Sequence, residues 1–433
     1  MRTRGIGQYA LVVVLGLMLR APLAGWFTHD YILYLLPWYQ FARAHGLGAL
    51  SVDFTNYAPF YSYLLIVIAR FDGLASPLVL IKVLSLVFEL ANAVLGVVLV
   101  RTCGGDRMRQ LAAFAFVWIA PTVLYNGAAW AQADSIWTSF ILISIWMFAR
   151  GGNGTPAFGM AFAGKAQALF LGPFVLGMLV RGGILRAAWL LVVPVIYLIV
   201  AVPVLLAGRT VVDVALVYGR QAGFYHSLSM NGANLWALLP RVPYTAGTIA
   251  GLGLAVVAAL WLARAIAMSP RRDAGYVVLA AAASLLLMPF LLPKMHDRYF
   301  YAFEVVAIVL ACVDRRYIAF AVIAQVDGVL SYLAFDQGIM LGVRLASVGN
   351  AVMVFFLARD LVRAPGATAF PRLAWAGYAA VVGATALFLP WTIHGLPGPI
   401  WKGAYAVLIV ATFAATILLL RRSLGSTAPP VMA

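Results

Sequence analysis

The segment "LLPKMHDRYFY" holds a dense group of side chains that could do chemistry. Lys294, His296 and Arg298 lie within five consecutive residues, and Asp297 stands between two of them. Three basic groups this close together are typical of an anion site, and a phosphate is the simplest such anion. Asp297 is placed to pair with one of them and orient it. The alternative is that these side chains only reach toward lipid headgroups from a helix end.

A single carboxylate, Asp30, stands apart from the other acids in the first polar segment, "FTHDYILYLLPWYQ". Tyr34, Trp38 and Phe41 follow it at a spacing of four and three residues, which predicts an amphipathic helix lying at a membrane surface. A carboxylate framed in this way could act as a general base on a hydroxyl group. The alternative is an ordinary aspartate at headgroup level beside interfacial aromatic residues.

Three further segments combine amides, aromatic rings and charges. Their candidate site residues are Trp130, Gln132 and Asp134 in "AWAQADSIW", Lys165 and Gln167 in "AGKAQALF", and Arg220, Gln221, Asn234 and Trp236 in "YGRQAGFYHSLSMNGANLW". Amides beside aromatic rings suit sugar binding, although interfacial anchors use the same residue types. Lys165 requires a partner if buried, either a bound phosphate or Asp134. Asp134 could instead cap a helix N-terminus.

The composition indicates which elements must position these residues. The 433-residue chain is 64% hydrophobic and 10% charged, with a mean hydropathy of +0.97. Soluble proteins carry about 25% charged residues, so the sequence predicts an all-α, polytopic membrane protein with the lipid bilayer as a partner. The net charge of +16 then reflects cytoplasmic loops rather than nucleic acid binding. The two cysteines form neither a disulfide framework nor a metal motif.

The arginine clusters predict the topology, since basic loops stay in the cytoplasm. This placement puts both termini in the cytoplasm and gives about 12–14 spans, near 8–25, 77–100, 110–126, 135–149, 156–166, 167–180, 186–208, 246–268, 276–292, 300–313, 317–334, 339–358, 373–390 and 402–420. Two of them, 156–166 and 167–180, are short and predict broken or buried helices. The run 59–72 predicts a short or re-entrant helix on the outer side.

The polar and aromatic segments described above all fall on the opposite, extracytoplasmic side in this topology. Only arginine clusters were used to orient the spans, so this sorting is an independent observation. Functional side chains gathered on one side are expected of an active site facing the periplasm or the exterior. We expect the protein in a bacterial inner membrane.

Five segments in one order, "HD…NYAPFY", "YNGAAWAQADS", "AFAGKAQALFLGPF", "NGANLWALL" and "LPKMHDRYF", resemble the GT-C superfamily of integral-membrane glycosyltransferases. The resemblance is strongest to bacterial relatives of the dolichyl-phosphate-glucose-dependent glucosyltransferases, and it covers about residues 20–310. It implies a GT-C-like catalytic module at 1–315, followed by C-terminal transmembrane helices at 316–433. It also implies a polyprenyl-phosphate-linked sugar as donor and inverting transfer to a glycan, glycolipid or protein acceptor.

The resemblance also implies roles for individual residues. Asp30 matches the family's catalytic base, and Lys165, His296 and Arg298 match positions that hold the donor phosphate, with Asp297 replacing a glutamate. The expected pocket residues are Tyr57, Trp130, Gln132, Asp134, Gln167, Arg220, Gln221, Asn234, Trp236 and Asp297. Tyr57 belongs to a motif in which Ala58 replaces a proline. No metal or other cofactor is expected, because a monophosphate donor does not need a cation to clamp a diphosphate.

Two alternatives to this function remain. A transporter or lipid flippase would use the charges that lie within predicted spans, Lys82, Glu89 and Asp327, because intramembrane charges are usually functional. A polysaccharide ligase or polymerase would use a lipid diphosphate donor, and more arginines would be expected around its phosphate site.

Overall fold

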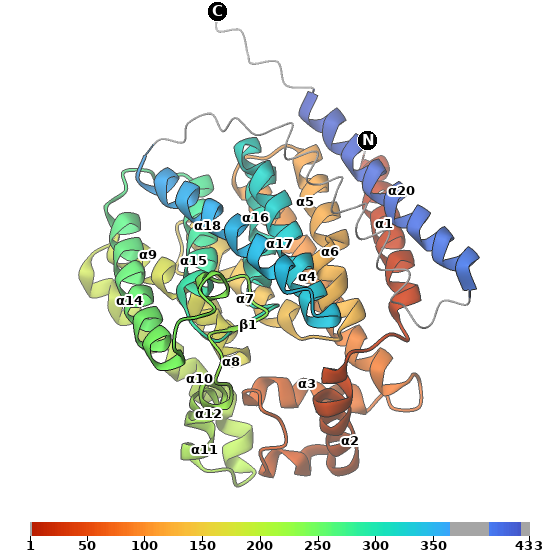
Figure 1. The fold of residues 1–433 in the computed structure, drawn as a ribbon, viewed down its shortest axis with the longest axis vertical. Helices are drawn as coiled ribbons and strands as arrows, with labels where there is room; N and C mark the ends of the chain where they lie inside the picture. Colours follow the sequence, from red (N-terminus) through yellow and green to blue (C-terminus); the bar gives the residue numbers. More distant parts are fainter. Residues whose placement is uncertain (1, 364–397, 426–433) are drawn as a thin grey trace, which may run out of the picture.

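The computed structural model describes residues 2–363 and 398–425, and this part of the chain is almost wholly helical (Figure 1). Eight of its helices are long and apolar enough to cross a membrane. They are Ile6–Leu23, Pro77–Thr102, Arg107–Ala129, Ile184–Leu206, Tyr244–Met268, Ala274–Leu291, Arg315–Gln337 and Met340–Val362. The predicted all-α, multi-pass membrane architecture is therefore confirmed.

The elements follow the apolar runs of the sequence. The first half of the chain forms α1 (Arg2–Arg20), η1 (Ala21–Leu23), η2 (Tyr31–Leu35), α2 (Leu36–His45), η3 (Gly46–Ser51), α3 (Pro59–Ala69), α4 (Pro77–Thr102), α5 (Arg107–Ile119), α6 (Pro121–Val123), η4 (Leu124–Ala129), α7 (Asp134–Ala149), α8 (Thr155–Gly164), η5 (Ala166–Leu171), α9 (Gly172–Val180), η6 (Ile184–Leu191) and α10 (Val192–Leu206). The second half forms α11 (Val211–Ala215), α12 (Val217–Phe224), β1 (Ser229–Met230), α13 (Leu235–Leu238), α14 (Tyr244–Met268), α15 (Ala274–Leu291), β2 (Met295–His296), α16 (Tyr301–Val313), η7 (Arg315–Tyr317), α17 (Ile318–Gln337), α18 (Met340–Val362) and α20 (Gly398–Gly425).

A helix forms at every predicted span within the described residues, whereas the predicted span 373–390 lies outside them. The run predicted as a short helix at 59–72 is α3, which begins at Pro59. Four apolar helices, Pro59–Ala69, Asp134–Ala149, Ala166–Val180 and Tyr301–Val313, are shorter than a full span. The count of 12–14 spans therefore stays a prediction.

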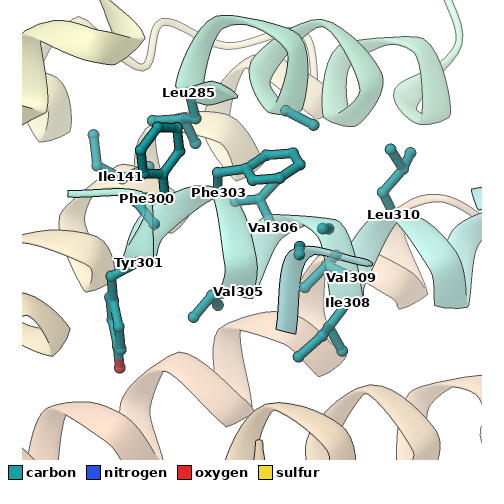
Figure 2. Packing of buried hydrophobic residues seen from close by; sticks show 14 of the residues in the cluster. Ile141, Leu285, Phe300, Tyr301, Phe303, Val305, Val306, Ile308, Val309 and Leu310 are labelled. Atoms are coloured by element: carbon teal, nitrogen blue, oxygen red, sulfur yellow. The ribbon is translucent and has the colours of Figure 1, made fainter. Parts of the chain in front are cut away.

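Helix α16 lies at the centre of the bundle. Its residues 301–310 are all buried, and it packs against α15, α17, α5 and α7. Figure 2 shows Phe303, Val306 and Val309 among the side chains around this helix, with Leu285 of α15 close by. Apart from the buried acid Glu304, this helix is apolar on all sides, as expected of a helix in a core. Its position brings the loop before it, residues 292–300, to the middle of one end of the bundle.

Helix α1 is fastened to α4 by two buried charged side chains. Nη2 of Arg20 lies 2.6 Å from Oε2 of Glu89, and the guanidinium also stacks on the Trp118 ring. Nζ of Lys82 donates a hydrogen bond of 2.6 Å to the Leu23 carbonyl oxygen. Buried charges are tolerated when they are paired in this way. Two of the three charges that a transporter would use therefore have structural partners.

Three of the predicted cytoplasmic arginine clusters, at residues 181–186, 271–272 and 359–363, are linked by contacts in space. Arg181 donates to the carbonyl oxygen of Ser269, and Arg271 donates to that of Asp360. The short elements α2, α3, α11 and α12 lie together at the lower end of the bundle in Figure 1. The structure thus groups the polar outer segments at one end, as the topology predicts, although it does not identify the side of the membrane.

The C-terminal helices share the core of the preceding residues. Helix α17 packs on α16, and α18 packs on α15. The side-chain amide of Asn350 on α18 donates to the carbonyl oxygen of Ala233, in the loop before α13. The boundary expected near residue 315 therefore falls inside continuous packing.

Candidate active site

A cavity of about 1060 Å³ opens at the end of the bundle that carries α2, α3 and α12. Segments far apart in the sequence meet around it. Nine of the expected catalytic, phosphate-binding and pocket residues line it: Asp30, Tyr57, Gln132, Lys165, Gln167, Arg220, Gln221, His296 and Arg298. The cavity is large enough for a sugar and the headgroup of a lipid, because ligand pockets commonly enclose about 300–1,000 Å³.

Asp30 lies at the cavity wall, directly before the π-helical turn η2. One of its carboxylate oxygens accepts a hydrogen bond of 3.3 Å from the side-chain amide of Gln132, and the same oxygen lies 3.5 Å from Nη1 of Arg298. The Asp30 side chain is 22% exposed. This carboxylate is therefore oriented by two neighbours and remains accessible to a substrate hydroxyl group.

Lys165 stands at the break between α8 and η5. Its backbone is extended, so the predicted break in this helix pair is confirmed. Its ammonium lies 2.5 Å from Oδ1 of Asp134 and 5.3 Å from the centre of the Tyr57 ring. Asp134 also accepts hydrogen bonds from Asn126 and from the Trp137 indole. The carboxylate is thus the partner that a buried lysine requires.

Asp134 is buried behind the cavity wall and does not line it. The predicted alternative role as a helix cap is wrong, because Ala133 occupies the cap position of α7 and Asp134 is the first helical residue. Its carboxylate is used instead to hold Lys165.

Arg298 is surrounded by carboxylates. Its guanidinium nitrogens lie 3.5 Å from Asp30, 3.8 Å from Asp134 and 3.9 Å from Asp297. Burial alone would lower the pKa of Arg298, but these three carboxylates raise it well above its usual value. The residue is a permanent cation at the cavity wall.

The expectation of three cations in the 294–298 segment needs correction. Burial, together with the charges of Arg298 and Lys165, lowers the pKa of His296 to about 3, so its ring is neutral near pH 7. The ammonium of Lys294 donates to the carbonyl oxygen of Ala222 at the end of α12. His296 can therefore offer a hydrogen bond to a phosphate but not a charge.

The loop carrying His296 is held by a short parallel ladder. Ser229 and Met230 of β1 pair with Met295 and His296 of β2, and the Asp297 amide donates to the Met230 carbonyl oxygen. The two polar loops at 218–236 and 293–300, which the sequence presents as separate motifs, thus form one wall.

Asp297 lies away from the cavity with its side chain fully buried. Its carboxylate oxygens have no hydrogen-bond partner within the described residues, and Arg298 is 3.9 Å away. Burial is the main cause that raises the pKa of Asp297 to about 7. The expected pairing with a neighbouring cation is therefore loose.

Three further candidates support the backbone rather than line the cavity. The Asn234 side chain caps α13 and donates to the carbonyl oxygens of Leu228 and Leu292. The Trp236 indole donates to the Leu291 carbonyl oxygen. Trp130 is buried against Tyr332 and Phe335. These contacts fix the loops that carry the cavity residues.

Helix α12 is tied across the cavity to the polar segment that precedes α3. Arg220 bridges Asp53 and Asp213 at 3.3 and 2.8 Å, and the Gln221 amide donates to the Asn56 carbonyl oxygen. Arg220 and Gln221 face the cavity, whereas the charges of this network are largely exposed. Exposed ion pairs of this kind stabilise a protein only weakly.

Two aromatic residues at the cavity, Tyr34 and Trp38, have a position that the sequence did not predict. Tyr34 and Trp38 line the cavity, although their spacing predicts a helix that lies at a membrane surface. Helix α2 does form there, and its placement at a membrane surface stays a prediction. The signal that could have identified these residues is their spacing from Asp30, four and eight residues, which places all three on one helix face.

The backbone around the cavity adopts several uncommon conformations. Ala131, Asn231 and Lys294 have positive φ angles of 56°, 59° and 64°. The π-helical turns η2 and η4 directly precede or follow site residues. Such features store strain and are frequent at functional sites.

No group of three or more His, Cys, Asp or Glu side chains placed to hold a metal ion occurs in residues 2–363 and 398–425. A comparison with models of protein families finds no match, and a comparison with curated proteins finds none either.

Proposed function

We propose that this protein is an inverting glycosyltransferase that transfers one sugar from a polyprenyl-phosphate donor to an acceptor hydroxyl group. The observation that carries the proposal is the geometry of Asp30, an accessible carboxylate 3.5 Å from the permanent cation Arg298 in one cavity. A transfer from a phosphate leaving group needs a base and a cation side by side.

The proposed reaction is a single displacement at the anomeric carbon. Asp30 accepts the proton of the acceptor hydroxyl group while the acceptor oxygen bonds to the anomeric carbon of the donor. The bond from that carbon to the phosphate oxygen breaks at the same time, and polyprenyl phosphate leaves with the electron pair. One displacement inverts the anomeric configuration, and Arg298 stabilises the negative charge that develops on the leaving phosphate.

The phosphate and the sugar of the donor would also be bound by neutral groups. His296 can donate a hydrogen bond from its uncharged ring, and the buried amide oxygen of Gln167 has no partner within the described residues. Both residues line the cavity. An unpaired buried amide oxygen is costly, so a hydroxyl group of the donor sugar is a suitable partner for it.

An apolar part of the cavity wall supports a lipid-linked donor. Leu169 of η5, Leu252 of α14 and Met288 of α15 line the cavity, and Leu169 and Leu252 are each 51% exposed. The cavity thus continues from its charged residues to apolar side chains on apolar helices. A nucleotide sugar has no part that would use such a wall, whereas an isoprenoid chain would bury apolar area there.

The experiment that tests the proposal is a transfer assay with purified protein and short-chain polyprenyl-phosphate monosaccharides. We expect release of polyprenyl phosphate from one donor, and a loss of about 10²-fold or more in Asp30→Asn. Binding of the donor should persist in this variant, because the carboxylate competes with the phosphate for Arg298. Asp53→Asn is the matched control, since Asp53 lines the same cavity but is tied to Arg209 and Arg220.

Normal turnover by Asp30→Asn would remove the base assignment. Absence of both donor binding and phosphate release with every donor would overturn the transferase proposal. Gradient-coupled transport would then be tested, with variants of Asp327, which keeps one carboxylate oxygen without a hydrogen-bond partner in the described part of the chain.

A further inference from the structure

We infer that Tyr34 and Trp38 form the binding site for the acceptor, and that the acceptor is a carbohydrate. This inference rests on the proposed function, because it assigns Asp30 as the base that receives the acceptor proton. The two rings and this carboxylate stand on one face of one helical segment, and all three line the cavity. The acceptor hydroxyl group would meet Asp30 while its sugar ring lies against the aromatic side chains.

The alignment of these three residues depends on the π-helical turn. In an α-helix, four residues go about 40° beyond one turn, so positions 30, 34 and 38 would drift around the axis. Residues Tyr31–Leu35 form a π-helix, in which hydrogen bonds run from i to i+5 and each residue turns the chain less. The rotation from position 30 to 34, which includes the π turn, is therefore smaller than in an α-helix, and this offsets the excess rotation from position 34 to 38. The π turn therefore keeps the carboxylate and both rings on the side of the segment that faces the cavity.

The rings are held in place by other aromatic residues. Trp38 packs edge-to-face against Tyr57 at 5.4 Å and Tyr61 at 6.4 Å, and its ring centre lies 5.8 Å from that of Tyr34. Tyr61 is buried, whereas Trp38 and Tyr34 are only half-buried and face the cavity. Rigid aromatic surfaces bind with little loss of conformational entropy.

Other residues of the same helical segment are exposed outside the cavity. Ile32 and Leu33 are 44% and 51% exposed and do not line it. A membrane surface would be contacted by these aliphatic side chains, so the aromatic residues are free for another role. Aromatic rings stack on the C–H faces of a pyranose, so the two rings suit a sugar acceptor.

Polar groups for the sugar hydroxyls lie on the neighbouring wall. Asn56 and Gln221 line the cavity, and they come from the segment before α3 and from α12. Arg220 on this wall already pairs with Asp53 and Asp213, and the cations Lys165 and Arg298 come from other elements. A neutral, hydroxyl-rich ring therefore fits beside Tyr34 and Trp38, while the donor phosphate fits beside the cations.

Equilibrium binding tests this assignment without requiring transfer. Purified protein in detergent would be titrated against fluorescently labelled neutral oligosaccharides of glucose, mannose, galactose and arabinose, with anisotropy as the readout. We expect saturable binding of one class, weakened about tenfold by Trp38→Ala and less by Trp38→Phe, which keeps an aromatic ring. Binding of polyprenyl phosphate, measured on the same samples, should not change.

Phe41→Ala is the matched control. Phe41 lies on the same helix as Trp38 and stacks on His45 and Phe54, but it does not line the cavity. If Trp38→Ala does not fold, Tyr34→Ala and Trp38→Phe still test the prediction. Polyprenyl phosphate binding by the wild type without oligosaccharide binding would overturn the inference and leave the proposed function standing. Equal weakening by Trp38→Ala and Phe41→Ala would also overturn it. Oligosaccharide binding without polyprenyl phosphate binding would support the sugar site and contradict the donor.

Discussion

Substitution of Asp134 by asparagine should destabilise the protein strongly, because it leaves the ammonium of Lys165 buried without a counter-charge. The two groups lie 2.5 Å apart, and their side chains are 1% and 6% exposed. At an effective dielectric constant of about 20, this separation corresponds to roughly 7 kcal/mol of attraction before desolvation. Breaking a buried pair typically costs about 3–5 kcal/mol in the free energy of unfolding. We expect a loss of this size, measured by SDS-induced unfolding in mixed micelles.

The double variant Asp134→Asn/Lys165→Met separates charge from packing. It removes both charges, and the new asparagine can still accept one hydrogen bond from Asn126 or the Trp137 indole. We expect it to regain most of the lost stability, because a neutral replacement of a buried pair is often close to neutral in free energy. A loss below about 1 kcal/mol in Asp134→Asn alone would refute the reasoning, since the lysine would then be solvated or already uncharged.

Three further predictions follow from individual contacts. The pKa of Asp297 rises from 3.8 to about 7 on folding, so its folded state binds the proton more tightly. The stabilisation from this group is therefore lost as the pH rises from about 4 through about 7, by up to about 4 kcal/mol in the free energy of unfolding. The free energy of unfolding of Asp297→Asn should lack this pH dependence. An unchanged pH dependence in the variant would contradict the prediction. Gly16→Ala should destabilise the protein by about 1–3 kcal/mol because a Cβ would collide with the Trp118 indole, whereas Gly7→Ala, with nothing within 4 Å, should not. Transfer activity should survive EDTA, since a monophosphate leaving group can be neutralised by Arg298; loss of activity that Mn²⁺ restores would contradict this prediction.

The helices could be predicted from the sequence because their signal is local. The run predicted at 77–100 is observed as Pro77–Thr102, where Ser76 caps the first turn and a proline begins the helix. The break at Lys165 could also be predicted, because two apolar runs that are too short to cross a membrane meet at this charged residue. These features depend on residues near one another in the chain.

The roles of amides and aromatic residues could not be predicted in the same way. Asn234 has a residue type that suits a sugar, yet its side chain caps α13 and binds two carbonyl oxygens. Trp130 is a stacking residue by type, yet it packs in the core against Tyr332. Whether a side chain faces a cavity or the protein interior depends on packing between distant segments, which a single sequence does not contain. The lowered pKa of His296 also depends on packing, because its main cause is burial, followed by the charges of Arg298 and Lys165.

The pairing of the two site cations distinguishes their expected roles. A buried cation needs a counter-charge in the absence of substrate, and each of the two has one. Lys165 and Asp134 form a short contact in which both side chains are almost fully buried. Arg298 and Asp30 are 3.5 Å apart, and their side chains are 13% and 22% exposed, so this contact is the one that an incoming phosphate can replace. Because the phosphate would take the place of the Asp30 carboxylate at Arg298, donor binding would release the carboxylate to accept a proton. We therefore expect Arg298 to bind the donor directly, and Lys165 to act by anchoring Tyr57 at the cavity wall to Asp134 behind it.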